Sequence, residues 1–356
     1  MNVNTIKGSL VLMSWLILGA GCNLFGGSSA TPESLGGVWF SKNQGETWES
    51  RFAIPTAVGV DSLSTVDVLE FEQDPKDPAA IYAGTAGNGY FFSYDHGTTW
   101  QRPTTEVVRT GAVYTIEVDP RDVCTIYVQK GDRVLKSTTC GRTFDKEVYL
   151  ETSTDERLSA MTLDWYNPQI LWLGTSDGDL LRSIDGGGTW APMYRLRDAI
   201  VDIEISQDDS RTILLSTNRN GYFRSTDGGL TWTDMEEAIK EFKKADNIYD
   251  IQQSKDGKVM LMASAFGLLK STDRGASWTK VPLVSASGEV RVRAVAISST
   301  DNQTYYYATA NAFYSSDNGG AAWDPKSLPS TRAGNALLVD SVNGDEVFLG
   351  LLTLAE

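Results

Sequence analysis

The sequence predicts an all-β fold in which seven similar units form one closed ring. First, a short turn-like stretch recurs with a period of 42 to 52 residues. Second, each interval holds short runs rich in β-branched and aromatic residues, separated by turn residues. Third, the two ends of the chain together supply the strands of one unit. Repeats of this length are typical of propeller blades, so we expect a seven-bladed β-propeller of four-stranded blades.

The recurring stretch is clearest at residues 183–190, which read Ser-x-Asp-x-Gly-x-Thr-Trp and follow a strand-like run. A short Asp side chain can accept hydrogen bonds from the backbone N–H groups of its own turn. Gly supplies the positive φ that such a turn often needs. Thr starts the next strand, and Trp covers the hairpin with a large apolar surface. We therefore interpret the stretch as a tight hairpin, called the repeat turn below.

Six further copies vary around this pattern. The copies at 93–100 and 225–232 are complete, and the copy at 271–278 changes only Thr to Ser. The copy at 41–48 has Asn for Asp, and the copy at 137–144 lacks both Asp and Trp. The last copy, read as 315–323, carries one extra residue before its Trp. The residues predicted to be structural in these turns are Asp95, Trp100, Asp185, Trp190, Asp227, Trp232, Asp273, Trp278 and Asp317.

The chain ends predict how the ring closes. The first repeat turn is preceded by one strand only, 37–41, and the last is followed by two strands, 336–342 and 346–352. Together they complete one blade shared between the N- and C-termini. Closure of this kind hides sheet edges that would otherwise invite aggregation. Residues 36–356 are thus predicted to form a single domain.

The N-terminus predicts export. Residues 1–21 resemble a signal peptide whose apolar run is too short for a transmembrane helix. The run ends Leu-Gly-Ala-Gly before Cys22, which resembles a bacterial lipoprotein box with Leu one place early. Residues 22–35 then form a flexible, lipid-anchored tether, and the protein is attached to the outer or cytoplasmic membrane surface of the cell envelope. The alternative is an ordinary secretory signal with an incidental cysteine.

Two irregularities interrupt the repeats. Cys124 and Cys140 lie at the mouth of one hairpin, and two remaining cysteines in an exported protein predict a disulfide. The bond replaces the missing Asp and Trp of the 137–144 turn. Residues 233–236 resemble a capping box, and 236–244 has helical spacing of apolar residues, which predicts a short helix between blades. We read that helix as a solvated connector or a recognition element.

Over about residues 37 to 325 the repeat turns resemble the Asp-box (BNR) repeats of several propeller families. These families include sialidases, xyloglucan-type glycoside hydrolases, sortilin-type receptors and the seven-bladed photosystem II assembly factors of chloroplasts and cyanobacteria. The resemblance implies that the boxes are structural and lie away from the functional face. The overall form is similar to the assembly factors, which implies a binding or scaffold protein at the cell envelope.

Glycoside hydrolysis is the alternative function. Residues 51–55 resemble the Arg-Ile-Pro segment of sialidases, but they follow the first box and contain two inserted residues. Xyloglucan hydrolases resembling this chain place their carboxylates between two propellers, and this chain has length for one. Asp202 and Glu204 are the best acidic pair, two apart on one face of a strand. The only histidine, His96, lies in a repeat turn. We expect no catalytic residue, metal or cofactor.

We expect one face of the propeller to bind a partner. The formal net charge of −15 argues against nucleic acid and against general adhesion to anionic lipid. We expect a monomer that binds a protein or glycan through the loops opposite the repeat turns, because Arg and Tyr often anchor interfaces. Pairing with Glu106, Asp198 and Asp202 is the alternative explanation for these arginines. The tentative binding residues are Arg109, Tyr194, Arg195, Arg197, Arg219, Arg291 and Arg293.

Overall fold

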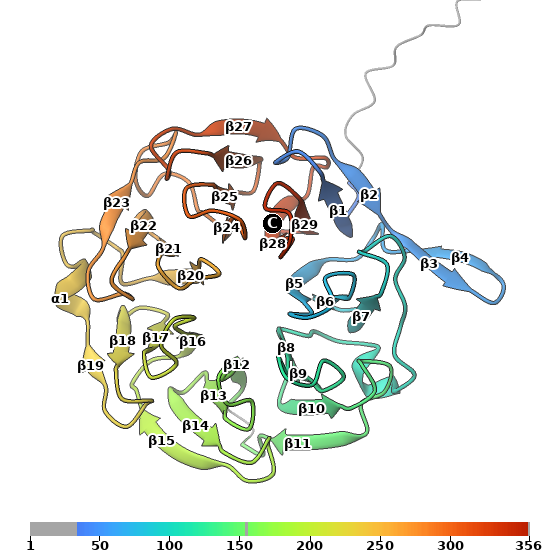
Figure 1. Ribbon diagram of the computed structural model, residues 1–356, viewed down its shortest axis with the longest axis horizontal. Coiled ribbons are helices and arrows are strands. Elements are labelled where there is room, and N and C mark those ends of the chain that lie inside the picture. Colours follow the sequence, from blue (N-terminus) through green and yellow to red (C-terminus); the bar gives the residue numbers. More distant parts are fainter. Residues whose placement is uncertain (1–33, 154–155, 355–356) are drawn as a thin grey trace, which may run out of the picture. The chain divides into compact units, whose positions relative to one another are not determined.

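A computed structural model of the chain describes residues 34–153 and 156–354. These residues form the seven-bladed β-propeller that the sequence predicts, with the blades arranged around a centre (Figure 1). The predicted signal peptide, Cys22 and the predicted tether up to residue 33 lie outside the described residues. Within the described ranges, no helix is long and apolar enough to span a membrane.

Each blade is an antiparallel sheet, with its first strand at the centre of the ring and its last strand at the rim (Figure 1). Blade 1 contains β5 (Val68–Gln73), β6 (Ile81–Thr85) and β7 (Tyr90–Ser93), with one bridge from Phe92 to Gln101 in place of a fourth strand. Blade 2 contains β8 (Thr115–Val118), β9 (Ile126–Lys130), β10 (Arg133–Ser137) and β11 (Lys146–Leu150). Blade 3 contains β12 (Leu158–Leu163), β13 (Leu171–Thr175), β14 (Asp179–Ser183) and β15 (Ala191–Arg195).

The other four blades follow the same order. Blade 4 contains β16 (Ile200–Ile205), β17 (Ile213–Thr217), β18 (Tyr222–Ser225) and β19 (Thr233–Asp234). Blade 5 contains β20 (Ile248–Gln253), β21 (Met260–Ser264), β22 (Gly267–Ser271) and β23 (Thr279–Val281). Blade 6 contains β24 (Ala294–Ile297), β25 (Tyr305–Ala308), β26 (Ala312–Ser316) and β27 (Asp324–Ser327). Blade 7 contains β28 (Ala333–Val339), β29 (Val347–Leu352), β1 (Val38–Ser41) and β2 (Glu49–Arg51).

The ring closes through blade 7, as predicted. Strand β1 pairs with β29 from Val38 opposite Gly350 to Ser41 opposite Val347. On its other side β29 pairs with β28. Strand β1 and the last two strands of the chain therefore share one sheet, so that residues from both ends of the described chain form a single blade.

The repeat turns form the predicted hydrogen bonds. In the 225–232 turn, Oδ1 of Asp227 accepts the N–H of Thr231 at 2.9 Å, and Oδ2 accepts the Thr231 hydroxyl at 2.6 Å. The Ser225 hydroxyl donates to Asp227 and accepts the N–H of Gly229 at 2.9 Å. The same set of bonds forms around Asp95, Asp185 and Asp273. These carboxylates are therefore fully used by their own turns.

The tryptophans of the repeat turns contact the preceding blade rather than only their own hairpin. Trp100 donates its indole N–H to the carbonyl of Arg51 at 3.0 Å, and Trp190 donates to the carbonyl of Val148 at 2.8 Å. Trp278 donates to the Tyr222 hydroxyl at 2.9 Å. Each of these indoles links its blade to the preceding one near the rim, while Trp232 packs edge-on against Trp172 of blade 3.

The last repeat turn corrects the sequence register. Ser316, rather than Ser315, accepts the N–H of Gly320 at 3.0 Å. Asn318, rather than Asp317, accepts the N–H of Ala322 at 2.9 Å. The turn thus has the usual length, with Asn in place of Asp as in the 41–48 turn. Asp317 is exposed and accepts none of these turn hydrogen bonds. The predicted register was wrong by one residue because Ser315 and Asp317, next to Ser316 and Asn318, also match the repeat pattern.

The predicted disulfide between Cys124 and Cys140 is present. Cys140 occupies the fourth position of its repeat turn, where the backbone φ is positive. Gln44, His96 and Arg274 hold the same position in other turns, also with positive φ. Each of their side chains bonds to an acidic residue elsewhere in the ring, and these bonds help offset the cost of the left-handed conformation.

Two further elements depart from the predictions. The helix predicted over 236–244 is a single turn, α1 (Glu236–Ile239), with Met235 at its N-cap and no side-chain cap bond. Thr233 and Asp234 instead belong to β19, which removes the predicted capping box. The sialidase-like segment 51–55 runs from the end of β2 into a hairpin of β3 (Ala53–Thr56) and β4 (Gly59–Ser62), which projects from the rim (Figure 1).

Candidate functional site

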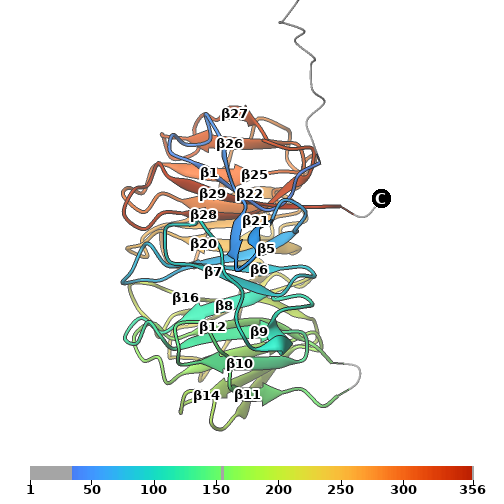
Figure 2. The same cartoon turned by 90° about the vertical axis from the view of Figure 1, so that its right-hand side faces the viewer.

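The alternation of antiparallel strands divides the loops between two faces of the ring, which Figure 2 shows edge-on. The repeat turns and the turns between first and second strands share one face, called the turn face. For example, the N–H of Gly186 bonds to the carbonyl of Gln169 at 2.9 Å. The connections between blades and the turns between second and third strands share the opposite face, called the connection face. All the predicted binding arginines lie on the strand ends and loops of the connection face.

A pocket of about 430 Å³ opens on the connection face around blade 4. Its walls are the β15–β16 connection, the β17–β18 turn and the β19–β20 connection that carries α1. The structure thus brings together four of the predicted binding residues. The lining residues are Tyr194, Arg195, Leu196, Arg197, Asp198, Thr217, Arg219, Asn220, Phe223, Asp234, Glu236 and Asp246.

Two guanidinium groups of this pocket are unpaired. Arg197 and Arg219 are exposed, and neither side chain forms an ion pair or hydrogen bond within the described ranges. Arg195, by contrast, pairs with Asp179 at 3.2 Å. The pairing that the sequence suggested for Asp198 does not form. Its carboxylate accepts the backbone N–H groups of Arg219 at 2.7 Å and Ala199 at 3.0 Å.

Asp198 therefore orders the loop that presents Arg219 without neutralising its guanidinium. The pocket is also lined by two aromatic side chains, Tyr194 and Phe223, whose ring centres lie 6.4 Å apart. A planar cation beside an aromatic surface suits a carboxylate-bearing ligand, which a guanidinium can bind through two parallel hydrogen bonds.

The other predicted arginines lie elsewhere on the connection face. Arg109, between blades 1 and 2, pairs with Glu106 at 2.8 Å, as the alternative explanation predicted. Arg291 lies over the Tyr249 ring at 4.0 Å. Arg293 is half-buried and donates to Asn335 at 2.8 Å, so it links blades 6 and 7. These three residues do not line the pocket.

Acidic side chains gather on the innermost strands, which sequence reasoning recognised only in part. Besides Asp202 and Glu204 of β16, they include Glu70 and Glu72 of β5, Glu117 of β8 and Asp250 of β20. Strands β5, β8 and β20 are far apart in the sequence, so only the closed ring reveals the cluster. Burial, followed by repulsion from Asp250, Glu117 and Asp202, raises the pKa of Glu70 well above its ordinary value.

Two of these carboxylates also bond to neighbouring blades. Asp250 accepts the N–H of Val295, on the next innermost strand, at 3.3 Å. Glu204 accepts a hydrogen bond from the side chain of Gln253 of blade 5. Glu204, one member of the Asp202–Glu204 pair, is thus part of the inter-blade bonding, a role that does not require catalysis.

We expect the propeller to become less stable as the pH rises from about 5 to 8.5. Burial raises the pKa of Glu117 from 4.5 to about 8 and, with repulsion from Asp250, raises that of Asp202 from 3.8 to about 7. In this range the folded state binds more protons than the unfolded state, so stability falls with pH. Glu117→Gln should flatten the dependence and raise the melting temperature at pH 8.5 by about 2–4 °C, corresponding to about 1 kcal/mol.

Gln has nearly the same shape as Glu but carries no charge, which makes the substitution conservative. Glu241→Gln, at an exposed position, is the matched control and should leave the pH dependence unchanged. Thermal melts of the three proteins at pH 5, 6.5 and 8.5 measure the effect. Equal melting temperatures of wild type at pH 5 and 8.5 would contradict this assignment.

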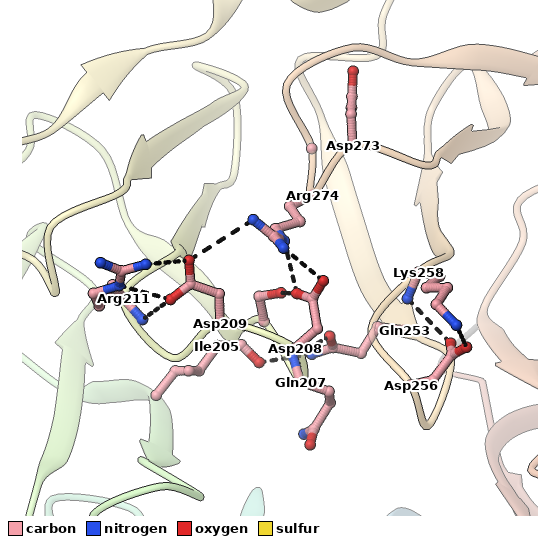
Figure 3. Close-up of polar contacts among 12 residues, drawn as sticks. Ile205, Gln207, Asp208, Asp209, Arg211, Gln253, Asp256, Lys258, Asp273 and Arg274 are labelled. Atoms are coloured by element: carbon pink, nitrogen blue, oxygen red, sulfur yellow. Dashed lines mark hydrogen bonds and ion pairs between the residues drawn. The ribbon is translucent and has the colours of Figure 1, made fainter.

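The turn face, in contrast, is cross-linked by ion pairs. Arg274 of blade 5 donates to both carboxylate oxygens of Asp208 of blade 4, at 2.7 and 2.8 Å (Figure 3). Asp209 pairs with Arg211 at 2.9 Å, and Asp256 with Lys258 at 2.9 Å. These charged groups, unlike Arg197 and Arg219, already have partners. The turn face is therefore the less suitable binding surface.

Comparison with known proteins supports the fold. No protein-family model and no curated protein matches this chain. Among solved structures, a GH74 xyloglucanase from Xanthomonas campestris matches 81% of this chain and 51% of its own length, with TM-score 0.67 and 18% identity. GH74 from Niastella koreensis matches similarly, with TM-score 0.66 and 19% identity. The chain thus spans about half the length of these two enzymes.

A second kind of structure matches over nearly its whole length. YCF48 bound to D1 peptide matches 81% of this chain and 94% of its own, with TM-score 0.62 and 14% identity. YCF48 is a photosystem II assembly factor, the class that the sequence resembles. At these identities the likenesses show the fold alone. The chain is a seven-bladed β-propeller, and its structural neighbours include both an enzyme class and an assembly factor.

Proposed function

We propose that this protein is a non-enzymatic binding protein of the cell envelope that captures a carboxylate-bearing peptide segment of a partner protein. The observation that carries the proposal is the pair of unpaired guanidinium groups, Arg197 and Arg219, in a pocket also lined by the aromatic rings of Tyr194 and Phe223. In an acidic chain whose other connection-face arginines largely have partners, these two are the free cations of the site. The likeness to a propeller bound to a peptide supports this reading.

The pocket also contains acidic groups, which narrow the kinds of ligand that it can bind. Asp234, Glu236 and Asp246 line the side formed by the β19–β20 connection. Arg197 and Arg219 lie on the other two walls. A segment with a carboxylate near one end and a cation or hydrogen-bond donors near the other would match both sides, whereas a polyanion would be repelled by the acidic wall. Complementarity of this kind gives specificity and orientation.

Replacing Arg195, Arg197 and Arg219 together by Ala is expected to reduce partner capture from native membranes at least tenfold. The melting temperature should change little, because exposed ion pairs contribute at most about 1 kcal/mol. The matched control replaces Arg121, Arg142 and Arg211, three exposed arginines of the turn face, and should capture normally. Affinity capture with a tagged protein, followed by mass spectrometry, measures both. Normal capture by the first variant would overturn the proposal.

We also propose that Cys22 anchors the protein through a lipid. The motif before Cys22 and the Gly- and Ser-containing segment that follows it support this attachment. Cys22→Ser should move the protein from the membrane fraction to the soluble fraction, with the melting transition of the propeller unchanged. Fractionation and intact-mass measurement check this result. A Cys22→Ser protein that stays in the membrane fraction without a bound partner would show that the anchor is not a lipid.

Glycoside hydrolysis is the second candidate function, favoured by the likeness to GH74 enzymes and by the acidic pair Asp202 and Glu204. The raised pKa of Asp202 is suitable for a general acid. Glu204, however, bonds to Gln253 of the next blade. We therefore expect no release of reducing sugar from xyloglucan. Release that is lost in Asp202→Asn would establish this function instead of the first.

A further inference from the structure

Three side chains able to bind a metal meet on the turn face, where blade 7 joins blade 1. They are His96, in the repeat turn after β7, Asp340, just after β28, and Glu346, just before β29. Nε2 of His96 lies 2.9 Å from Oδ2 of Asp340 and 3.8 Å from Oε2 of Glu346. All three ligand atoms lie within 4.8 Å of one another. For a zinc ion with bonds of about 2.0–2.2 Å, neighbouring ligand atoms lie about 3.3 Å apart, so small side-chain movements would accommodate it.

The imidazole is held in place by its surroundings. The His96 ring packs edge-on against Phe40 at 5.5 Å and Phe348 at 5.1 Å. Its backbone has φ of 57°, and its N–H bonds to the carbonyl of Ala79 at 2.9 Å. The side chain is nevertheless 30% exposed, so an ion can reach it from solvent. The packing directs Nε2 toward the two carboxylates.

The carboxylates have supporting partners of the kind found around metal ligands. Oδ1 of Asp340 accepts the N–H groups of Val342 at 2.9 Å and Asn343 at 2.8 Å. Gln73 donates to Oδ2 at 2.7 Å, which fixes the orientation of Asp340. Asn343 donates to Oε1 of Glu346 at 3.2 Å, which leaves Oε2 facing His96. Two of the three ligands are therefore oriented by hydrogen bonds and the third by aromatic packing.

From this arrangement we propose that His96, Asp340 and Glu346 bind a divalent first-row transition metal such as Zn²⁺. One imidazole nitrogen and two carboxylate oxygens suit such an ion, with water completing its coordination. Binding replaces the hydrogen bond from His96 to Asp340 with metal bonds and releases the Nε2 proton to solvent. The ion would connect blade 1 to the C-terminal hairpin of blade 7, the seam at which the ring closes. This inference is independent of the pocket on the opposite face.

The experiment titrates ZnCl₂ into the full chain after removal of metal with EDTA. His96 is the single histidine in the sequence, so its imidazole NMR signals report this site without ambiguity. We expect saturable shifts of these signals at about one equivalent and a rise in melting temperature of about 5 °C at saturating Zn²⁺. Slower unfolding should accompany the rise, because the ion ties the closing hairpin to blade 1.

Two variants separate metal binding from simple packing. His96→Gln should abolish the thermal shift while keeping the fold, because Gln44 occupies the same position of another repeat turn with a φ of 55°. Glu346→Gln keeps the His96–Asp340 bond and should weaken Zn²⁺ binding at least tenfold. No change in the imidazole signals up to 1 mM ZnCl₂ (roughly a thousandfold above a micromolar Kd) would overturn the proposal. An equal thermal shift in His96→Gln would also overturn it.

Discussion

Deleting residues 347–356 is expected to abolish cooperative folding of the entire propeller, rather than to fray one end. The deletion removes β29, which pairs with β28 on one side and with β1 on the other. Its residues Val347, Phe348, Leu349 and Leu351 are completely buried. Losing the burial of four such side chains removes about 6–12 kcal/mol of stabilisation, comparable to the whole stability of a typical domain. Loss of this strand would also leave β1 and β28 as open edges.

Deletion of residues 353–356 is the matched control, because it leaves β29 intact and removes only two hydrogen bonds from Thr353 to Asp67 among the described hydrogen bonds. Circular dichroism melts and limited proteolysis compare the two proteins. The longer deletion should show no sharp transition and cleavage throughout the ring. A sharp transition near the wild-type temperature, with cleavage confined to blade 7, would contradict closure as the source of cooperativity.

Gly229→Ala is expected to destabilise the propeller by about 2–5 kcal/mol, because two costs add. Gly229 has a φ of +81°, which an L side chain adopts at a cost. A Cβ at this position would lie 2.3 Å from the ring of Trp172, on β13 of the preceding blade. Trp172 is almost completely buried and cannot move without disturbing the core. The glycine thus permits both the turn and the close contact between blades 3 and 4.

The neighbouring Gly228 separates these two costs. It has a φ of +75°, but a Cβ there would meet no atom within 4 Å. Gly228→Ala should therefore cost only about 1–2 kcal/mol, from the backbone alone. Urea unfolding of both variants measures the difference. Equal destabilisation would show that the contact with Trp172 contributes nothing to the requirement for glycine.

Local sequence patterns predicted the fold well because each blade repeats them. The Asp and Gly of the repeat turn form hydrogen bonds within eight residues, so the conformation of the turn can be predicted from the sequence. The two strands missing from the first unit and the two strands after the last turn likewise predicted closure. The register error at Ser316 arose where two adjacent residues could play the same role. Only the geometry of the turn separates them.

The sites were harder to predict because they depend on distant residues. Asp202 could be placed on one face of a strand, but its interaction with Glu117 and Asp250 requires the closed ring. His96 was assigned to a turn, whereas its partner Asp340 is 244 residues away. Arg197 and Arg219 were named as binding residues, but sequence alone could not separate them from Arg109, which is paired. Pairing partners decide which charges are free.

Site-specific photo-cross-linking tests most directly whether the pocket binds the partner. A photoreactive residue at Asn220, which lines the pocket, should cross-link to the captured partner in native membranes. The matched position is Leu230, which is 70% exposed in the repeat turn of the same blade, on the opposite face. If the partner binds in the pocket, position 220 should give a cross-link that disappears when Arg197 and Arg219 are replaced by Ala. Position 230 should give no cross-link. A partner cross-linked from position 230 and not from 220 would contradict binding in the pocket.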